Sequence, residues 1–240
     1  MDFFVYFCSM KTAFFTGRMK MADIIAANYS LILVMPRLGI PLGFGEKSLF
    51  EVCRQHGLPA DFVLLICNVH TFDGFEVDDA MLQSTDLTLL VPYLQTSHRY
   101  YLNERLPHIG RHLSRVADGA GERYSTLLNT FFSDYRNEVC DHFLSEEQEI
   151  FPYLQQLQQG NTVVRPVARH FVDNHSDIVD KLADLTQIVY KYIPGDRMTE
   201  ELNELVFGIL QLSADLEKHA LIEEKILLPY VAQLERRLQR

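Results

Sequence analysis

Apolar residues recur at alternating steps of three and four along the last two-thirds of the chain, which is the spacing of a buried stripe on an α-helix. Long runs with this spacing cover about residues 86–116, 122–158, 163–192 and 199–240. Short breaks that contain Gly, Pro or Asn separate the runs at 118–121, 160–161 and 194–195. Because short connections make successive helices antiparallel, the pattern predicts an all-α fold with an up-down-up-down four-helix bundle.

The first third of the chain follows a different pattern. Residues 20–75 contain short helix-compatible segments separated by Gly and Pro, including Ser48-x2-Glu51, a capping box that begins a helix. Residues 76–85 are acidic and not periodic, which indicates a linker. Residues 1–19 are apolar but too short to span a membrane, and their positive charges follow the apolar run, unlike those of a secretory signal. The predicted organisation is an extension or misplaced start at 1–19, a small helical unit at 20–75, a linker at 76–85 and the bundle at 86–240.

Two segments of the predicted bundle share one motif. Residues 142–154 and 219–231 both read His-x3-Glu-Glu-x4-Pro-Tyr followed by an aliphatic residue. His98 precedes the first motif by 44 residues, and His175 precedes the second by the same 44. The spacing predicts a duplicated helical hairpin, in which the first helix of each copy carries one His and the second carries a His-x3-Glu pair.

These His and Glu residues continue the apolar stripes of their helices. In the last helix the stripe runs through Leu216 to His219 and Glu223, and the same count in the second long helix leads to His142 and Glu146. A buried carboxylate without a partner costs several kcal/mol. Since the stripe holds no Lys or Arg at that level, a metal ion is the simplest source of the missing positive charge.

The ligand types narrow the choice of metal. Imidazoles and carboxylates without a thiolate suit iron, manganese or zinc, and six donors are too many for one tetrahedral zinc ion. Helical bundles build carboxylate-bridged di-metal centres from such sets, and we favour two irons. A single His on an apolar helix face is usually a core residue, so the prediction depends on the repeated spacing. The predicted ligands are His98, His142, Glu146, His175, His219 and Glu223.

Other polar residues near the motifs carry weaker signals. His108 and His112 form another i,i+4 pair, but both lie off the line through His98, which favours a solvated surface. Glu147 and Glu224 follow the predicted ligands and point about 100° away from them around the helix. We therefore expect these two carboxylates to support the ligands from outside the site, or to be exposed, rather than to bind metal.

The two His-x3-Glu-Glu-x4-Pro motifs, the upstream His98 and His175 and the predicted bundle resemble hemerythrin-like proteins. More closely, about residues 20–240 resemble the repair-of-iron-centres family, bacterial cytosolic di-iron proteins linked to nitrosative and oxidative stress. The resemblance implies an oxo-bridged pair of irons in which Glu146 and Glu223 are the bridging carboxylates and each iron has two His ligands. The chain departs from this family in its N-terminal unit, where Gly43-Phe44 replaces a Cys-Cys pair, so the residues for a thiol-dependent step are missing there.

Composition limits the partners and the compartment. The formal net charge is −10, and no basic stripe offers a footprint for nucleic acid. The four Cys residues are scattered without a Cys-x2-Cys motif, which favours neither a disulfide framework nor a zinc knuckle. Together with the absence of a predicted membrane span, these features predict a cytoplasmic protein that binds neither nucleic acid nor membrane.

Three functions remain open at this level. The first is a non-haem di-iron protein of the stress response that reacts with nitric oxide or peroxide, or supplies iron for iron–sulfur cluster repair, with damaged iron–sulfur proteins as partners. The second is oxygen binding or sensing, although hemerythrin-like domains of that kind usually have an additional His ligand. The third is an interaction protein, such as a homodimer, that a metal stabilises. The sequence does not decide whether the protein is an enzyme.

Overall fold

The computed structural model describes residues 14–161, 175–193 and 199–238. These residues form helices, with one isolated bridge between Lys20 and Ser48 and no strand. The prediction of an all-α fold is therefore confirmed. Within the same ranges, no helix is both long and apolar enough to cross a membrane.

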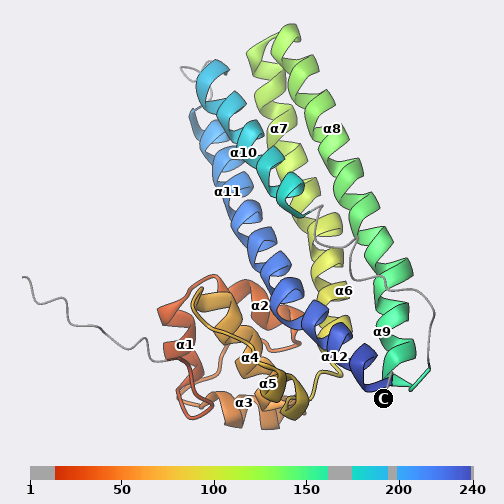
Figure 1. Ribbon diagram of the computed structural model, residues 1–240. Coiled ribbons are helices and arrows are strands. Elements are labelled where there is room, and N and C mark those ends of the chain that lie inside the picture. The colour runs from red at the N-terminus through yellow and green to blue at the C-terminus, as the bar shows by residue number, and fades with distance from the viewer. Residues whose placement is uncertain (1–13, 162–174, 194–198, 239–240) are drawn as a thin grey trace, which may run out of the picture.

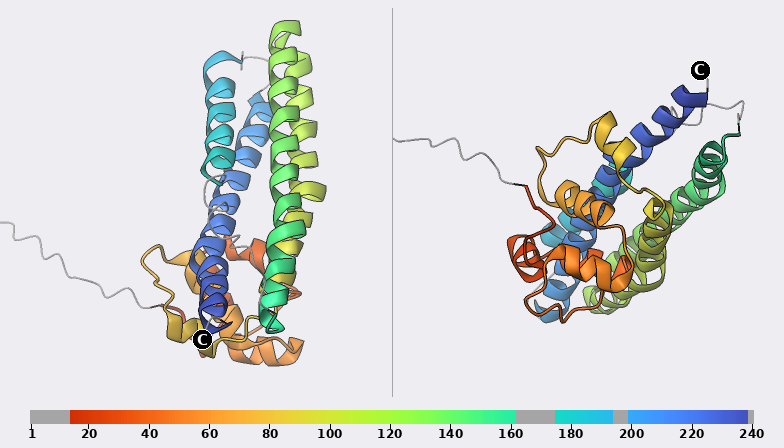
Figure 2. Two further views of the ribbon diagram at one scale, coloured as in Figure 1. Left: turned by 45° about the vertical axis from the view of Figure 1, so that its right-hand side comes forward. Right: turned by 90° about the horizontal axis from the view of Figure 1, so that it is seen from below.

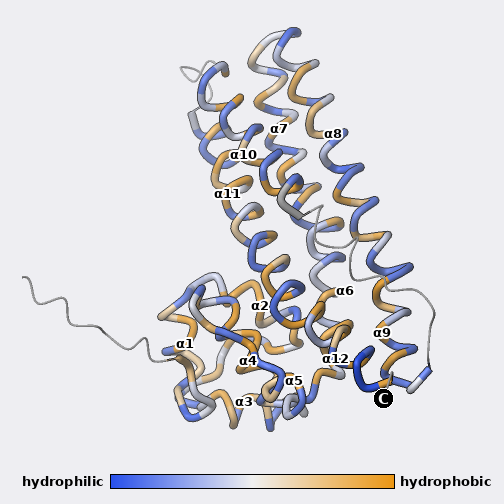
Figure 3. The backbone as a smooth tube through the Cα atoms, in the orientation of Figure 1, coloured by the Kyte–Doolittle hydropathy of each residue, from blue (hydrophilic) through white to orange (hydrophobic). Residues whose placement is uncertain are grey.

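Four long helical rods form the bundle, and each successive rod runs in the opposite direction (Figure 1). In the bundle α7 packs against α8 and α11, and α10 packs against α11 and α8. Apolar residues recur along each rod, as the colouring of Figure 3 shows, and those of α7, α8, α10 and α11 are buried in one cluster. The rods are α6 (Leu90–Tyr100) with α7 (Leu106–Ala120), α8 (Glu122–Ser145) with α9 (Phe151–Gln158), α10 (His175–Tyr192), and α11 (Thr199–Ile222) with α12 (Leu228–Leu238).

A π-helical turn joins the two halves of three rods. These turns are η1 (Tyr101–Arg105), η2 (Glu146–Ile150) and η3 (Glu223–Leu227). Each lies just before a proline, at Pro107, Pro152 or Pro229. In a regular α-helix the proline ring collides with the carbonyl four residues earlier. A turn widened by one residue relieves that collision, which accounts for the π turn before each proline.

Short helices of the N-terminal unit cover one end of the bundle (Figure 2). The predicted capping box is confirmed, because the Ser48 hydroxyl accepts from the Glu51 N–H and the Glu51 carboxylate accepts from the Ser48 N–H. The five helices are α1 (Met21–Ala27), α2 (Leu31–Arg37), α3 (Leu49–His56), α4 (Ala60–Thr71) and α5 (Asp79–Ser84).

The segment predicted as a linker, residues 76–85, contains the short helix α5. Asp78 caps α5 by accepting a hydrogen bond from the Met81 N–H at 2.7 Å. Asp79 then binds α12, where its carboxylate pairs with Arg236 at 3.0 Å and its carbonyl accepts from Gln233. A helix of six residues is too short for a hydrophobic period to be recognised in sequence, and contacts with α12 hold it in place.

The N-terminal unit and the bundle are not separate in their packing. Ile66 of α4, Leu154 of α9 and Val231 of α12 belong to one buried cluster, which we call the junction core. The upper bundle has its own core, which includes Leu128 of α8 and Ile209 of α11. Four of the predicted metal ligands, His98, Glu146, His219 and Glu223, lie where these two cores meet.

Candidate metal centre

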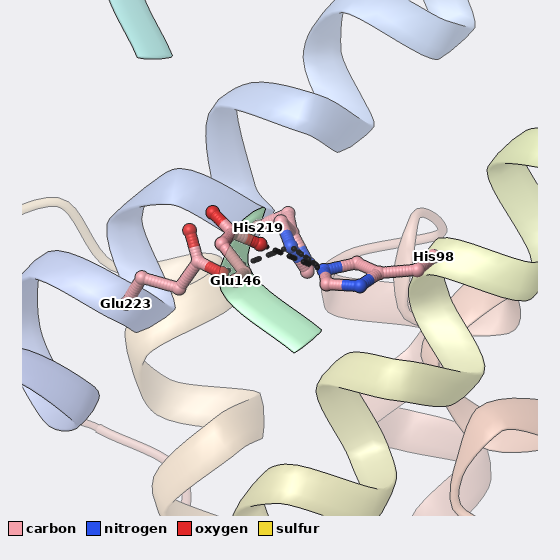
Figure 4. Close-up of side chains that lie close together, drawn as sticks. All are labelled: His98, Glu146, His219 and Glu223. Carbon is pink, nitrogen blue, oxygen red and sulfur yellow. Dashed lines mark hydrogen bonds and ion pairs between the residues drawn. The ribbon is translucent and has the colours of Figure 1, made fainter. Parts of the chain in front are cut away.

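Four predicted ligands lie together in the interior. One donor atom from each of His98, Glu146, His219 and Glu223 falls within 4.8 Å of the others. They come from three rods, as Figure 4 shows, with His98 on α6, Glu146 at the start of η2, and His219 and Glu223 on α11 and η3. All four are at most 3% exposed, so the cluster is shielded from bulk water.

The Glu146 carboxylate contacts imidazoles on both of its sides. Its Oε1 is 2.8 Å from His142 Nε2, and its Oε2 is 3.1 Å from His98 Nε2. In the second motif, Glu223 Oε1 is 3.2 Å from His219 Nε2. Both motif pairs are i,i+4 neighbours at the end of an α-helix, so the regular helix before each π turn sets their spacing. Glu146 thus lies between two imidazoles that come from different rods, with one carboxylate oxygen toward each.

The electrostatics of the cluster favour a positive charge. Burial by itself lowers the pKa of His98, but the hydrogen bond and charge of Glu146, the charge of Glu223 and the hydrogen bond of Glu147 outweigh it and raise that pKa above its usual value. His98 Nε2 and His219 Nε2 are also only 3.2 Å apart. Two carboxylates and two converging imidazole nitrogens in a dry site form a donor set that fits a cation.

Glu147 holds the other side of the His98 ring. Its Oε1 is 3.0 Å from His98 Nδ1. Because a carboxylate can only accept, Nδ1 carries the proton, and in the neutral ring the lone pair of Nε2 is left facing the cluster. Glu147 thus contacts His98 from outside the four-residue cluster. Its support of a metal ligand stays a prediction.

Aromatic rings form the walls of the site. Phe143 stacks on the His98 ring with the centroids 4.1 Å apart, and Phe151 stacks at 5.6 Å. The Tyr101 ring stands perpendicular to His219 at 5.5 Å. These contacts restrict the rotation of both imidazoles and keep water away from them.

The remaining predicted residues have different outcomes. His142 touches Glu146 but is not part of the four-residue group. His175 begins α10, and its side chain lies outside the described residues. His108 and His112 lie side by side on α7 with ring centroids 4.6 Å apart, outside the group. That all six predicted ligands bind metal stays a prediction.

Sequence reasoning missed an ion pair next to the site. Arg37 of α2 and Asp215 of α11 are both buried and form a two-point salt bridge between the N-terminal unit and the bundle. The partners are 178 residues apart. The sequence pattern around Arg37 or Asp215 does not predict this contact.

Fold and site together define a metal-binding four-helix-bundle protein with a buried His and Glu cluster. Residues 90–231, more than half of the chain, match the family model described as hemerythrin HHE cation binding domain. The chain belongs to this family.

Similar proteins extend the match into the N-terminal unit. Iron-sulfur cluster repair protein ScdA of Staphylococcus haemolyticus is 20% identical over 187 residues, which cover 76% of this chain and 83% of that protein. The protein of the same name from Staphylococcus epidermidis strain RP62A is 23% identical over 217 residues, covering 88% and 96%. The resemblance to the repair-of-iron-centres family is thereby confirmed.

Proposed function

We propose that this chain is a non-haem di-iron protein of the stress response that serves iron–sulfur cluster repair, by reacting with nitric oxide or peroxide or by supplying iron. The observation that carries the proposal is the Glu146 carboxylate, with one oxygen toward His142 and the other toward His98. A carboxylate in that position suits two metal ions rather than one.

The residues divide into two halves around the carboxylates. His98 and His219, with one oxygen each from Glu146 and Glu223, would hold one iron. His142, the predicted ligand His175 and the other oxygens of Glu146 and Glu223 would hold the second. Imidazole and carboxylate donors without thiolate suit iron, and the relatives named for iron–sulfur cluster repair support that choice over manganese or zinc.

When bound, the two irons supply redox change and open coordination positions for a small ligand. The chain's own residues prepare the site for that chemistry. Phe143 and Phe151 exclude water around His98. Glu147 accepts a hydrogen bond from the proton-bearing Nδ1 of the His98 ring, so the lone pair of His98 Nε2 stays available to a metal ion.

Thiol chemistry has little support in the described residues. Burial raises the pKa of Cys53 to about 11 and that of Cys67 to about 12, so both are thiols at neutral pH. Cys140 is exposed on α8 and two residues from His142. Since Gly43-Phe44 stands in place of the family's Cys-Cys pair, iron delivery would proceed from the bundle site in the cytoplasm, with damaged iron–sulfur proteins as the recipients.

The test is metal analysis with optical spectroscopy on full-length protein purified with and without oxygen. We expect about two irons per chain and the absorption of an oxo-bridged diferric centre. Glu146→Ala and Glu223→Ala should each lose iron, whereas Glu149→Ala, an exposed change in the same π turn as Glu146, should keep it.

Nitric oxide, peroxide and oxygen titrations of the reduced protein then separate the functions. Turnover of nitric oxide or peroxide with a reductant, or transfer of iron to an apo iron–sulfur protein, supports the proposal. A stable and reversible oxygen spectrum without turnover supports oxygen binding or sensing instead. Zinc in place of iron, or iron retained by both Glu variants, would refute the di-iron assignment.

A further inference from the structure

Arg37 is the last residue of α2, and its buried, charged side chain reaches from the N-terminal unit into the bundle. Its Nη1 donates to Asp215 Oδ1 at 3.0 Å, and its Nη2 pairs with Asp215 Oδ2. The same Nη1 donates to the Tyr101 hydroxyl at 3.2 Å. The guanidinium also lies over the rings of Tyr100 and Tyr101, 4.6 and 5.0 Å from their centroids. One side chain therefore contacts both the first and the last rod of the bundle.

The partners of Arg37 are next to predicted metal ligands. Asp215 lies one helical turn before His219 on α11. Tyr101 lies three residues after His98, and its ring packs against the His219 ring. The Tyr101 hydroxyl donates in turn to the Asp215 carbonyl at 3.3 Å. Arg37, Asp215 and Tyr101 thus form a closed network that ties the His98 helix to the His219 helix.

A buried ion pair is a poor way to gain stability, because desolvation offsets most of the attraction and apolar residues of similar volume do as well. What a two-point Arg–carboxylate contact adds is direction, since the planar guanidinium fixes the orientation of its partner. The stacking on two tyrosines restricts the guanidinium further. The network is suited to holding two helices in register.

We propose that Arg37 is a positioning residue of the metal centre, through which the N-terminal unit sets the placement of His98 against His219. This role rests on the proposed function, because it requires a metal between His98 and His219. It does not require that metal to be iron. In this chain, whose N-terminal unit lacks the Cys-Cys pair, the unit then acts on the site through packing and charge.

Cobalt(II) is the probe, because its visible spectrum reports the ligand geometry. The full-length protein is loaded with cobalt, and its spectrum and its rate of metal loss to a chelator are measured. The main variant is Arg37→Met with Asp215→Leu, which removes the pair without leaving a buried charge alone. We expect thermal unfolding of the metal-free form close to that of the wild type, an altered cobalt spectrum, and metal loss about tenfold faster.

Lys218→Met is the matched control. Lys218 also joins α11 to the N-terminal unit, one residue before His219, but its pair with Asp73 at 2.8 Å is exposed. We expect this variant to keep the wild-type spectrum and release rate. Arg37→Lys retains the charge without the two-point contact, so it covers the case in which the double variant does not fold, and its spectrum should change in the same direction.

The outcomes separate the two levels of the proposal. A folded double variant, or a folded Arg37→Lys variant, with wild-type spectrum and release would overturn the role of Arg37. An equal effect of Lys218→Met would also overturn it, because any disturbance of the junction would then suffice. A wild-type protein that takes up no cobalt overturns the metal site and this role together, whereas cobalt uptake without native iron overturns the di-iron assignment alone.

Discussion

Glu147 and Glu149 lie in the same π turn but have different surroundings, which makes them a matched pair for testing support of a ligand. Glu147 contacts His98 Nδ1, whereas Glu149 is exposed. We predict that Glu147→Leu releases bound metal about tenfold faster than the wild type, because His98 loses the acceptor that fixes its tautomer and orientation. Glu147→Gln keeps an acceptor oxygen without the charge, so its rate of metal release should lie between those of the wild type and Glu147→Leu.

The measurement is the rate of metal transfer to a chelator. Glu149→Leu serves as the control for removing one negative charge from η2 and should release metal at the wild-type rate. Equal rates for the Glu147 and Glu149 variants would mean that the contact with His98 has no influence on metal binding.

His70 is a buried imidazole whose charge state affects stability. Burial lowers its pKa from 6.5 to about 4, and Arg37 and Lys218 contribute in the same direction while Asp215 opposes them. Between those two pH values the unfolded chain binds a proton that the folded chain does not. Stability is therefore lost as the pH falls from about 6.5 to about 4, by up to about 3 kcal/mol from this residue.

Urea unfolding of the metal-free protein at pH 7 and at pH 4.5 measures this effect. His70→Gln removes the titrating group, so its stability should fall less with decreasing pH than that of the wild type. Other histidines titrate in both proteins and cancel in the comparison. Parallel loss of stability in both proteins would show that His70 is protonated equally in the folded and unfolded states.

At the scale of elements, a π turn interrupts each of the three rods that carry the four clustered residues. Glu146 and Glu223 each begin such a turn, and each accepts the backbone N–H five residues later at its carbonyl. The proline that follows favours the wide turn because it cannot continue a regular α-helix. The position of these carboxylates relative to the following helix thus depends on a proline that touches no metal.

Pro152→Ala tests this dependence. We predict faster metal loss to a chelator, because a regular α-turn can now compete with the π turn. Stability of the metal-free protein should be unchanged, or higher by at most about 3 kcal/mol. Pro92→Ala in the first turn of α6 is the control, since a proline there displaces no hydrogen bond. If Pro152→Ala lost metal at the wild-type rate, the proline would have no influence on metal binding.

At the scale of the whole molecule, the junction core joins the N-terminal unit to the bundle end. Ile226, Leu227 and Val231 of η3 and α12 are buried together with residues of α1–α4. We predict that a chain reduced to residues 86–240 aggregates or unfolds without a cooperative transition, because these apolar side chains lose their cover. Gel filtration and thermal unfolding check this. A monodisperse fragment with wild-type metal content would show that the bundle is an independent domain.

Long, strongly periodic segments were predictable from the sequence. The apolar stripes indicated the rods, since a helix must bury one face whatever its partner is. The duplicated His-x3-Glu-Glu motif indicated the candidate ligands for the same local reason, because residues four apart share a helix face. The prolines inside the rods were visible as well, although the π turns before them were not.

Tertiary structure alone decided how these local features meet. The short helix α5 exists within the predicted linker because α12 binds it, and the Arg37–Asp215 pair joins positions 178 residues apart. The two oxygens of Glu146 face His142 and His98 because two rods approach at that level. Sequence by itself therefore determined the helices and the chemistry of the donors, which depend on neighbours along the chain. The junction of the two cores and the orientation of the ligands depend on contacts between distant residues, and local periodicity carries no information about those.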